Sequence, residues 1–461
     1  VGQLPNPHPA LLEAYRRAIR SICERGRSGD VIGADGISLK LSALHPRYRF
    51  RQRQRVLEEL LPRVRELALL AAGGNIGFNI DAEECDRLDL SLELFEALAR
   101  DPALRGWDGL GFVLQSYQKT ALPVCEWLIA LGRDTGRRLM VRLVKGAYWD
   151  GEIKHAQERG LVDYPVYTRK CHTDLCFELC SARLLEARDA VYAKFATHNA
   201  YSVALVRHLA GDSRDYEFQR LHGMGQLLYG ELYRQDPDIP VRVYAPVGNH
   251  RDLLPYLVRR LLENGANSSF VNRFLDAEVP PQQLIEDPAA ETRRLGVGPH
   301  TRIPLPRDLY RDAAQPWLNA RGIDLDDPDA VEDLLATVRE VAGQRHRAAP
   351  IVDGRWRAGT ARPVFNPARS EQQVGTVVDS DDDAMEAALA SAQAAQPAWD
   401  RAGVERRAAL LERAAGLYEE HCASLMGLVA TEAGRTLDDG LSEVREAVDF
   451  LRYYAQQARA L

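Results

Sequence analysis

Residues 139–146 read LMVRLVKG, a short apolar run that contains one arginine and ends in lysine and glycine. Short runs that are apolar at nearly every position, rather than at alternate positions, are typical of strands covered on both faces of a parallel sheet. Six further segments of the first 275 residues have this character: GISLKL (36–41), NIGFNID (75–81), GLGFVLQ (109–115), YAKFATHN (192–199), YEFQRL (216–221) and VRVYAP (241–246). The sequence therefore predicts seven buried strands in this part of the chain.

Helical patterns separate these strand segments. The stretches RQRQRVLEELLPRVRELALLAAG (51–73) and SLELFEALAR (91–100) repeat apolar residues at helical spacing. Strands that alternate with helices predict parallel βα units, and hence an α/β fold. Such a fold is either a doubly wound open sheet or a (β/α)8 barrel.

Polar side chains stand at or just after the ends of most of these strands. In a barrel the carboxyl ends of all strands meet at one mouth, where the active site is built, whereas in an open sheet they follow an edge. This convergence favours a (β/α)8 TIM-like barrel. Such a barrel has eight strands and seven are predicted, so we expect the missing strand at the amino end, upstream of Val1. The polar residues concerned are Lys40, Asp81, Gln115, Arg142, Lys145, His198, Asn199 and Tyr244.

Composition narrows the functional class. The chain has 461 residues, of which 46% are hydrophobic and 27% charged, and a formal net charge of -7. This length suits two or three domains, and the net negative charge argues against a dedicated nucleic-acid binder. No apolar run is long enough to span a membrane and no signal peptide begins the sequence, so we expect a cytoplasmic protein.

The seven cysteines are scattered and indicate reduced thiols rather than a disulfide framework. Cys171, Cys176 and Cys180 lie near His172, but the segment contains no CxxC pair and has a helical pattern. We therefore expect no metal site. The stretch HGMGQLL (222–228) lacks the third glycine of a dinucleotide fingerprint, so it indicates a tight turn.

The predicted mouth is rich in cations, and the stretch LLPYLVRRLLENGAN (253–267) adds two adjacent arginines on one helix. Arg259 and Arg260 are either part of a solvated face, with Arg259 paired to Glu263, or a binding site for a carboxylate or phosphate. Lys40 is a second open case, because a lysine at a strand end can also act as a Schiff-base nucleophile if its pKa is lowered.

Several longer stretches resemble the proline dehydrogenase barrel of the bifunctional proline utilization A family, from about residue 36 to 272. This resemblance implies FAD-dependent oxidation of L-proline to Δ1-pyrroline-5-carboxylate, with electrons passed to a membrane quinone. The stretches are GISLKLSALHPRY (36–48), VRLVKGAYWDGEIKHAQERG (141–160), YPVYTRKCHTD (164–174), FATHNAYSVA (195–204), FQRLHGMG (218–225), YAPVGNH (244–250) and LLPYLVRRLLENGANSSFVN (253–272).

The resemblance implies roles for the cationic residues. Lys40, Arg259 and Arg260 would hold the proline carboxylate, and Asp81 would support this cluster. The solvated-face interpretation of the arginines and the Schiff-base interpretation of Lys40 then lose most of their weight. A lysine-dependent lyase and a non-catalytic barrel scaffold stay as alternative functions.

The resemblance also implies contacts with the proline ring and the flavin. Arg142 would lie near flavin N5, where the hydride from proline C5 arrives, so the implied catalytic residues are Arg142, Asp81 and Lys40. The residues expected to pack on the pyrrolidine ring are Tyr148, Leu221 and Tyr244. The residues expected to contact FAD are Gln115, Arg142, Lys145, Gly146, Trp149, Thr168, Lys170, His198, Asn199, Gln219 and Glu263.

A second domain is predicted after the barrel. We expect the barrel over residues 1–275, a polar linker over 276–300, and a second α/β domain over 301–461. The segment RWRAGTARPVFNPARSEQQVGTVV (355–378) predicts a hairpin, and the helical patterns after it resemble the amino-terminal part of an aldehyde dehydrogenase. The family's second domain oxidises glutamate semialdehyde with NAD.

That second activity is not expected from the residues present. It needs a cysteine nucleophile, and the only cysteine after residue 300 is Cys422, which lies in the packing pattern GLYEEHCASLMGLV (416–429). The expected partners are L-proline and a quinone, and no nucleic acid is expected. Peripheral contact at the inner face of the cell membrane and homo-oligomerisation are both left open.

Overall fold

The computed structural model describes residues 8–25, 29–248, 253–254, 258, 287–312 and 316–460. The chain divides into two compact units. The first consists of Val1–Glu152 and Pro165–Ile303, and the second of Ile153–Tyr164 and Pro304–Leu461. The domain limits predicted from the sequence stay a prediction.

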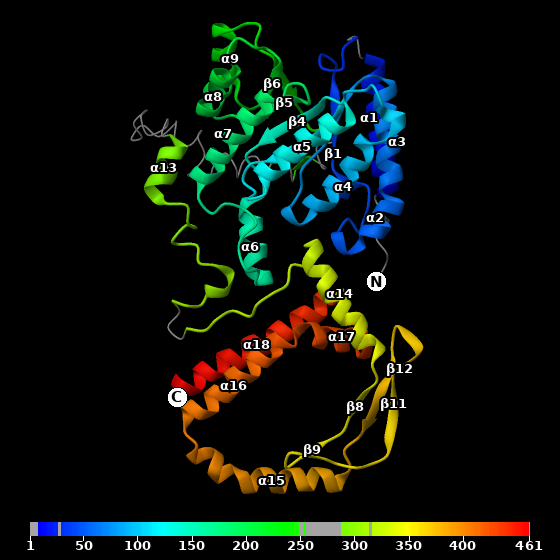
Figure 1. Ribbon diagram of the computed structural model, residues 1–461, viewed down its shortest axis with the longest axis vertical. Coiled ribbons are helices and arrows are strands. Elements are labelled where there is room, and N and C mark those ends of the chain that lie inside the picture. Colours follow the sequence, from blue (N-terminus) through cyan, green and yellow to red (C-terminus); the bar gives the residue numbers. More distant parts are fainter. Residues whose placement is uncertain are drawn as a thin grey trace. The chain divides into compact units, whose positions relative to one another are not determined.

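The first unit is built on a seven-stranded sheet in which every strand pairs in parallel with the next one along the chain (Figure 1). All seven strands predicted from the sequence are present, and every residue of β2 and β3 is buried. The strands are β1 (Gly36–Leu39), β2 (Gly77–Ile80), β3 (Leu110–Gln115), β4 (Leu139–Val144), β5 (Val191–Ala196), β6 (Tyr216–Leu221) and β7 (Val241–Tyr244).

Helices connect successive strands and bury their apolar faces. In α3, for example, Val64, Leu67, Ala68 and Ala71 are buried at the three- and four-residue spacing of one helix face. The described helices of this unit are α1 (His8–Arg25), α2 (Arg53–Glu59), α3 (Leu61–Gly73), α4 (Leu88–Ala99), α5 (Ala121–Thr135), α6 (Trp149–Arg159), which continues into the second unit, α7 (Lys170–Glu186), α8 (Ala200–Ala210), α9 (Gln226–Gln235) and α13 (Pro288–Leu295).

The sheet is curled into a half-barrel, and one arginine joins its two ends. The Arg242 guanidinium, on β7, donates to the carbonyl oxygens of Ile32 and Ala34, just before β1, at 2.6 and 2.7 Å. Its Nε also donates to both carboxylate oxygens of Glu217 on β6, at 2.9 and 3.0 Å. The curl confirms the predicted barrel-like class over the strands that the structure describes.

A buried lysine completes this interior group of charges. Lys194 on β5 lies 4.0 Å from the Glu217 carboxylate, and its Nζ donates to the sulfur of Met140 at 2.9 Å. Burial lowers the pKa of Lys194 to about 8, although the carboxylate opposes this effect. For Glu217, burial alone would raise the pKa, but Lys194 and Arg242 outweigh it and lower the pKa.

The amino edge of the sheet is fixed by a second buried arginine. Arg137, two residues before β4, donates to the carbonyl oxygens of Ala99 and Leu104 at 2.6 Å each. It also donates to those of Asp101 and Trp107 at 3.1 Å. These carbonyls end α4 and the turn after it, where helix termini leave acceptors unsatisfied. The amino edge is therefore held by hydrogen bonds from the Arg137 side chain to main-chain carbonyls.

The second unit contains the predicted hairpin. Strand β11 (Ala361–Asn366) pairs antiparallel with β12 (Arg369–Val378), and β12 pairs in parallel with β8 (His346–Ala348). The short strands β9 (Ile351–Val352) and β10 (Arg355–Trp356) form a separate pair. The helices are α14 (Pro328–Gly343), α15 (Asp382–Arg401), α16 (Val404–Glu420), α17 (Cys422–Glu432) and α18 (Leu437–Ala460).

Cys422 opens helix α17 in this unit. Its side chain is half-buried against a core cluster that includes Met426 and Leu441, and its thiol lies 3.8 Å from the Met426 sulfur. Burial raises the pKa of this thiol. These contacts confirm the prediction that Cys422 belongs to a packing helix.

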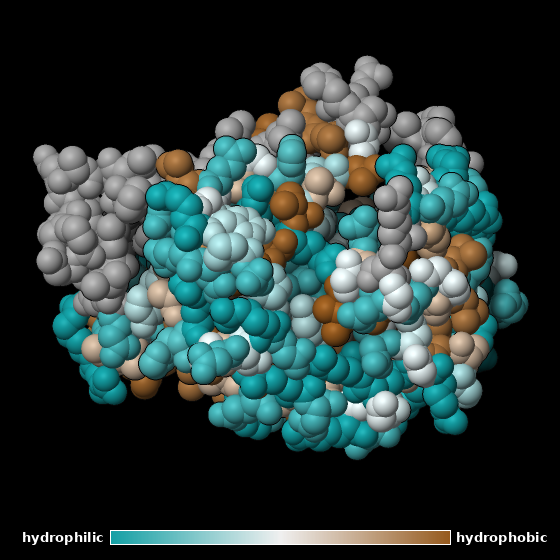
Figure 2. Space-filling view, turned by 90° about the horizontal axis from the view of Figure 1, so that it is seen from above, coloured by the Kyte–Doolittle hydropathy of each residue, from teal (hydrophilic) through white to brown (hydrophobic). Residues whose placement is uncertain are grey.

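Within the described residues, no helix has both the length and the apolar character needed to cross a membrane. On the face seen in Figure 2, hydrophilic side chains predominate and the hydrophobic ones form separate patches.

Candidate active site

The candidate site lies at the carboxyl edge of the half-barrel. Gln115 ends β3, and Lys40, Asp81 and Lys145 directly follow β1, β2 and β4. Leu39 pairs with Ile80 in the sheet register, so Lys40 and Asp81 leave neighbouring strands at the same level. The structure thus brings these four predicted residues to one edge.

Lys40 is held by a tyrosine and stays charged. Its Nζ donates to the Tyr148 hydroxyl at 2.6 Å and lies 5.3 Å from the centre of the Tyr148 ring. Burial would lower the pKa of Lys40, but Tyr148, Asp81 and Glu83 outweigh burial and raise it. A Schiff-base lysine needs the opposite shift, so the environment favours a charged, anion-binding Lys40.

Arg142 forms the centre of a second group inside the curl. One terminal nitrogen donates to the Ser38 hydroxyl at 2.6 Å, the other lies 3.7 Å from an Asp81 carboxylate oxygen, and the guanidinium lies 5.2 Å from the centre of the Tyr244 ring. Its Nε is buried and has no hydrogen-bond partner among the described residues. A buried donor without a partner is costly, so this atom is available to a ligand.

Ser38 was missed by the sequence analysis. It lies two residues before Lys40 on β1, so the alternation of a strand places both side chains on the same face. Ser38 lies between apolar residues in the sequence, a pattern that is typical of a small residue in a buried strand and does not indicate a site residue.

A third group joins the end of β4 to α7. Lys145 donates to one oxygen of Asp174 at 2.5 Å, and Lys170 binds the other oxygen. Both lysines were predicted from the sequence, whereas Asp174 was not. The spacing of Lys170 and Asp174, four residues apart on one helix, was the available signal.

Several predicted flavin-contacting side chains are already fixed by the protein. The amide nitrogen of Gln115 donates to the Glu83 carbonyl at 2.9 Å, and that of Gln219 donates to the Glu217 carboxylate at 2.5 Å. The Trp149 indole donates to the Tyr167 carbonyl at 2.8 Å. These bonds set the orientation of each side chain before any ligand arrives.

The same holds beside β5 and β6. Asn199 caps helix α8 by accepting from the Ser202 amide at 3.2 Å, and His198 accepts from the Leu221 amide at 3.1 Å. The buried Thr168 hydroxyl accepts from the His300 amide at 2.9 Å.

Gly146 has a backbone reason to be glycine. Its φ is +133°, and an added Cβ would lie 2.4 Å from the Tyr117 ring. A side chain at this position would therefore displace Tyr117 or the turn after β4.

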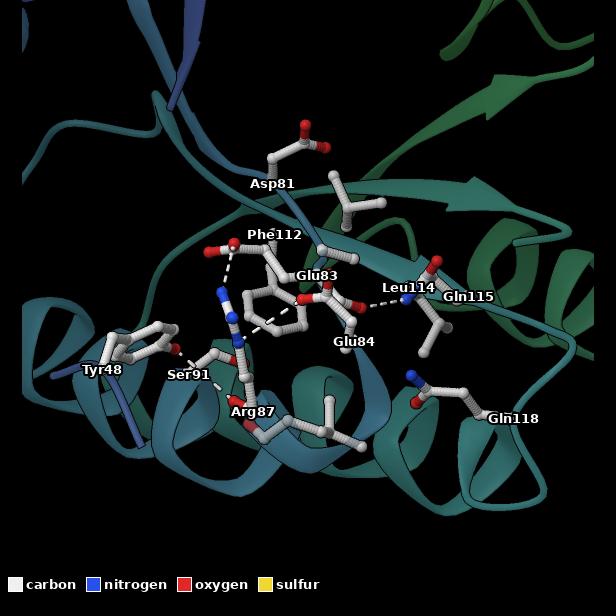
Figure 3. A pocket seen from close by; sticks show the side chains of 13 residues that line it. Tyr48, Asp81, Glu83, Glu84, Arg87, Ser91, Phe112, Leu114, Gln115 and Gln118 are labelled. Carbon is white, nitrogen blue, oxygen red and sulfur yellow. Dashed lines mark hydrogen bonds and ion pairs between the residues drawn. The ribbon is translucent and has the colours of Figure 1, made fainter. Parts of the chain in front are cut away.

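A carboxylate network beside the site was also missed. Glu83 accepts from the Ser42 amide at 3.0 Å and from Arg87 at 2.8 Å, which ties the segment after β1 to the segment after β2. Figure 3 shows Arg87 directed at Glu83 in a small pocket, while the Asp81 carboxylate points away from this pair. The network positions the chain on both sides of Lys40 and Asp81.

The predicted residues Arg259, Arg260 and Glu263 lie outside the described residues. No group of three or more potential metal ligands occurs among the side chains that the structure describes. Cys171, Cys176 and Cys180 are buried in α7.

The arrangement suits an anionic ligand with a planar or cyclic part. Lys40, Arg142, Lys145 and Lys170 bring positive charge to one edge, and Tyr148 and Tyr244 offer aromatic faces beside two of these cations. The buried Arg142 Nε adds a donor inside the curl.

Comparisons with known proteins agree with this arrangement. The proline dehydrogenase family matches residues 8–273, and the aldehyde dehydrogenase family matches residues 356–461. The bifunctional protein PutA of Salmonella typhimurium is 46% identical over 98% of this chain and 35% of its own length. That of Rhizobium meliloti is 47% identical over 96% of this chain and 36% of its own length.

Solved structures give the same result. A crystal structure of bifunctional proline utilization A is 46% identical, with a TM-score of 0.87 over 98% of this chain and 43% of that chain. The protein from Bdellovibrio bacteriovorus inactivated by N-propargylglycine is 27% identical, with a TM-score of 0.87 over 98% of this chain and 48% of that chain. The chain thus spans about a third of the length of the curated PutA relatives that it matches.

Proposed function

Because the chain belongs to the proline dehydrogenase family, we propose that it oxidises L-proline to Δ1-pyrroline-5-carboxylate with FAD as the electron acceptor. The observation that carries the proposal is the charged Lys40, bonded to Tyr148 at the same edge as Arg142 and Asp81. An ammonium group beside an aromatic ring suits an amino acid whose carboxylate and apolar ring must both be held.

Binding of proline would begin with its carboxylate. Lys40 supplies a charged donor at the end of β1, and Arg259 and Arg260 would add two guanidinium groups. Arginine offers a planar pair of donors that matches the two oxygens of a carboxylate, whereas lysine offers a point charge. Capture of the carboxylate fixes the ring that follows it.

Orientation of the ring would come from apolar contacts. Tyr148 and Tyr244 lie beside Lys40 and Arg142, and Leu221 ends the neighbouring strand β6. Asp81, 3.7 Å from Arg142, keeps the guanidinium directed into the curl. A fixed ring position reduces the entropy that the reaction would otherwise lose.

The donor set fits a flavin dinucleotide. Arg142 Nε is a buried donor that we assign to the flavin ring near N5, and Lys145 and Lys170 are cations for the phosphates. When bound, FAD supplies the hydride acceptor for proline C5, while the protein supplies position and electrostatics. Gly146, Gln115 and Gln219 would line the same cofactor, together with Trp149, Thr168, His198, Asn199 and Glu263.

The acceptor of the electrons would be a quinone, reached by peripheral contact with a membrane. We do not propose the NAD-dependent oxidation of glutamate semialdehyde for this chain, because Cys422 is a packing residue at the start of α17. With L-proline the chain should reduce an artificial electron acceptor, and with glutamate semialdehyde it should not reduce NAD. NADH production by this 461-residue chain would contradict that part of the proposal.

A visible absorption spectrum tests the proposed function. The protein, purified and supplied with FAD, should show a flavin band that L-proline bleaches under anaerobic conditions, and D-proline serves as the matched control. A protein that stays colourless after reconstitution would favour a non-catalytic scaffold. Trapping of a substrate on Lys40 by borohydride would favour a lysine-dependent lyase, against which the raised pKa of Lys40 argues.

A further inference from the structure

Asp174, on the second turn of α7, is a single carboxylate placed between two ammonium groups. One of its oxygens accepts from Lys145 Nζ at 2.5 Å, and the other binds Lys170. Lys145 directly follows β4 and Lys170 is the first residue of α7. One side chain therefore joins two elements that both reach the candidate site.

The charges of this group do not cancel. Burial would raise the pKa of Asp174, but the two lysines outweigh burial and lower it, so the carboxylate stays ionised. The nearby carboxyl of Glu178 accepts from the Tyr201 hydroxyl at 2.9 Å, and burial raises its pKa. Asp174 is the acceptor that the two ammonium groups share, so within this group one carboxylate faces two cations.

Lys145 depends on this partner for its own charge. Burial lowers the pKa of Lys145, Lys170 lowers it further, and Asp174 and Glu178 oppose both effects. Its Nζ also lies 5.6 Å from the centre of the Phe177 ring. Without Asp174, the balance would shift toward the neutral amine.

The segment that carries Lys170 is held from outside the group. Arg169 donates to the carbonyl oxygens of Gly298 and Pro299 at 3.0 Å each, and the Thr168 hydroxyl accepts from the His300 amide at 2.9 Å. The backbone before α7 is therefore fixed independently of Asp174. Loss of the carboxylate should release the two ammonium groups rather than the helix.

We propose that Asp174 is a positioning residue that holds the ammonium groups of Lys145 and Lys170 side by side for the diphosphate of the flavin cofactor. The inference rests on the proposed function, since it assigns the cofactor to this edge. Asp174 acts through the lysines, because a carboxylate and a phosphate repel each other.

The test is the affinity of the apoprotein for FAD, measured by fluorescence titration between pH 6 and pH 9.5. Asp174→Asn should raise the dissociation constant for FAD about 10-fold at pH 8, because the charge-assisted hydrogen bonds that hold Lys145 and Lys170 in position are lost. The sign of the pH effect follows from Lys145: affinity of the variant falls as rising pH removes its proton, and acid partly restores it. The wild-type protein should hold its affinity to higher pH.

Two variants serve as controls. Glu186→Gln removes another carboxylate of α7, one that pairs with Arg183 on the surface, and should leave FAD affinity and its pH profile unchanged. Asp174→Glu keeps the charge and should retain the flat profile between pH 7 and pH 9. Lys145→Met should cost less FAD affinity in the Asp174→Asn background than in the wild-type protein.

Unchanged or tighter FAD binding by Asp174→Asn would overturn the inference, because tighter binding would make Asp174 a competitor of the phosphates. If the Asn variant does not fold, an Asp174→Glu variant whose affinity falls between pH 7 and pH 9 would overturn it equally. A wild-type protein that binds no FAD would instead overturn the proposed function.

Discussion

Two groups of charged side chains lie in the same half-barrel and use their cations differently. At the carboxyl edge, Asp174 divides its two oxygens between Lys145 and Lys170. Among the strands, Glu217 lies between Lys194 and Arg242, and Arg242 also donates to two main-chain carbonyls. In this interior group, the Nε and both terminal nitrogens of Arg242 are bonded to the protein.

The difference separates cations that build the fold from cations that can serve a ligand. All three nitrogens of Arg242 donate to acceptors of the protein, and these bonds hold its guanidinium against Glu217 and the two carbonyls. An ammonium group has three donors, and the described contacts of Lys145 and Lys170 use Asp174 as their shared acceptor. Position at the carboxyl edge, rather than charge alone, therefore marks a binding residue.

The largest effect should come from the interior arginine. Arg242→Met leaves the carbonyls of Ile32 and Ala34 without their donor and weakens the pairing of Glu217, so we expect a loss of about 3–5 kcal/mol in the free energy of unfolding. Urea denaturation followed by circular dichroism measures this loss. Arg242→Lys is the control that keeps the charge, and it should recover part of the stability. A midpoint equal to that of the wild-type protein would contradict the assigned role.

Lys194 should give a smaller effect with a distinctive pH dependence. Its folded-state pKa of about 8 lies below the ordinary lysine value of 10.5. Below pH 8 both the folded and the unfolded state hold the proton, and the folded state bears the full cost of burying the charge. Between these two values the unfolded state binds more protons, and stability from this group rises with pH.

Lys194→Met should remove that penalty. The shift corresponds to stabilisation on the order of 3 kcal/mol at pH 7, and the advantage over the wild-type protein should shrink as pH approaches 10. Denaturant midpoints at pH 7, 8.5 and 10 measure it. An advantage that stays constant over this range would show that Lys194 does not titrate as described.

A carboxylate at the mouth should affect turnover more than stability. Asp81→Ala removes the partner 3.7 Å from Arg142 and should lower turnover with L-proline about 10-fold, the consequence of losing on the order of 1.4 kcal/mol of orientation. Steady-state kinetics and a denaturation midpoint are measured on the same preparation. Wild-type turnover in Asp81→Ala would remove this residue from the site.

The smallest effect is expected from an exposed ion pair. Arg133 and Asp189 form a pair at 2.9 Å in which both side chains are more than half exposed. Solvent and salt screen such pairs, so Arg133→Gln should leave both the denaturation midpoint and turnover within experimental error. A marked loss of stability would mean that the contribution of an ion pair to stability does not depend on its burial.

The strands were predictable because a parallel sheet covered on both faces forces nearly continuous apolar runs, as in LMVRLVKG. Lys40, Asp81 and Lys145 were predictable because the polar residues that break or follow such runs are conspicuous. The hairpin of the second unit was predictable from its turn residues. These features depend on local sequence, which is why their positions agree with the structure.

Residues whose importance depends on a distant partner were not predictable. Glu83 looks like an ordinary loop carboxylate, and the spacing of Asp174 from Lys170 indicates no more than an ion pair within one helix. Only the fold brings Ser42 to Glu83 and Lys145 to Asp174. The same holds for Arg242, whose acceptors lie about 210 residues earlier in the chain. Pairings across the sheet arise from its curl, and curl leaves no local pattern.

The hydrogen bonds by which Arg242 links β7 to the segment before β1 also affect how the sheet opens locally. In the described part of the chain, β1 and β7 each pair on one side only, and Arg242 links these two edges through side-chain hydrogen bonds. A ladder opens cooperatively, whereas two bonds from one guanidinium open in a single local event. Amide hydrogens of β1 and β7 should therefore exchange with solvent well before those of β3 and β4, and exchange mass spectrometry would record the edges as the first part of the sheet to open.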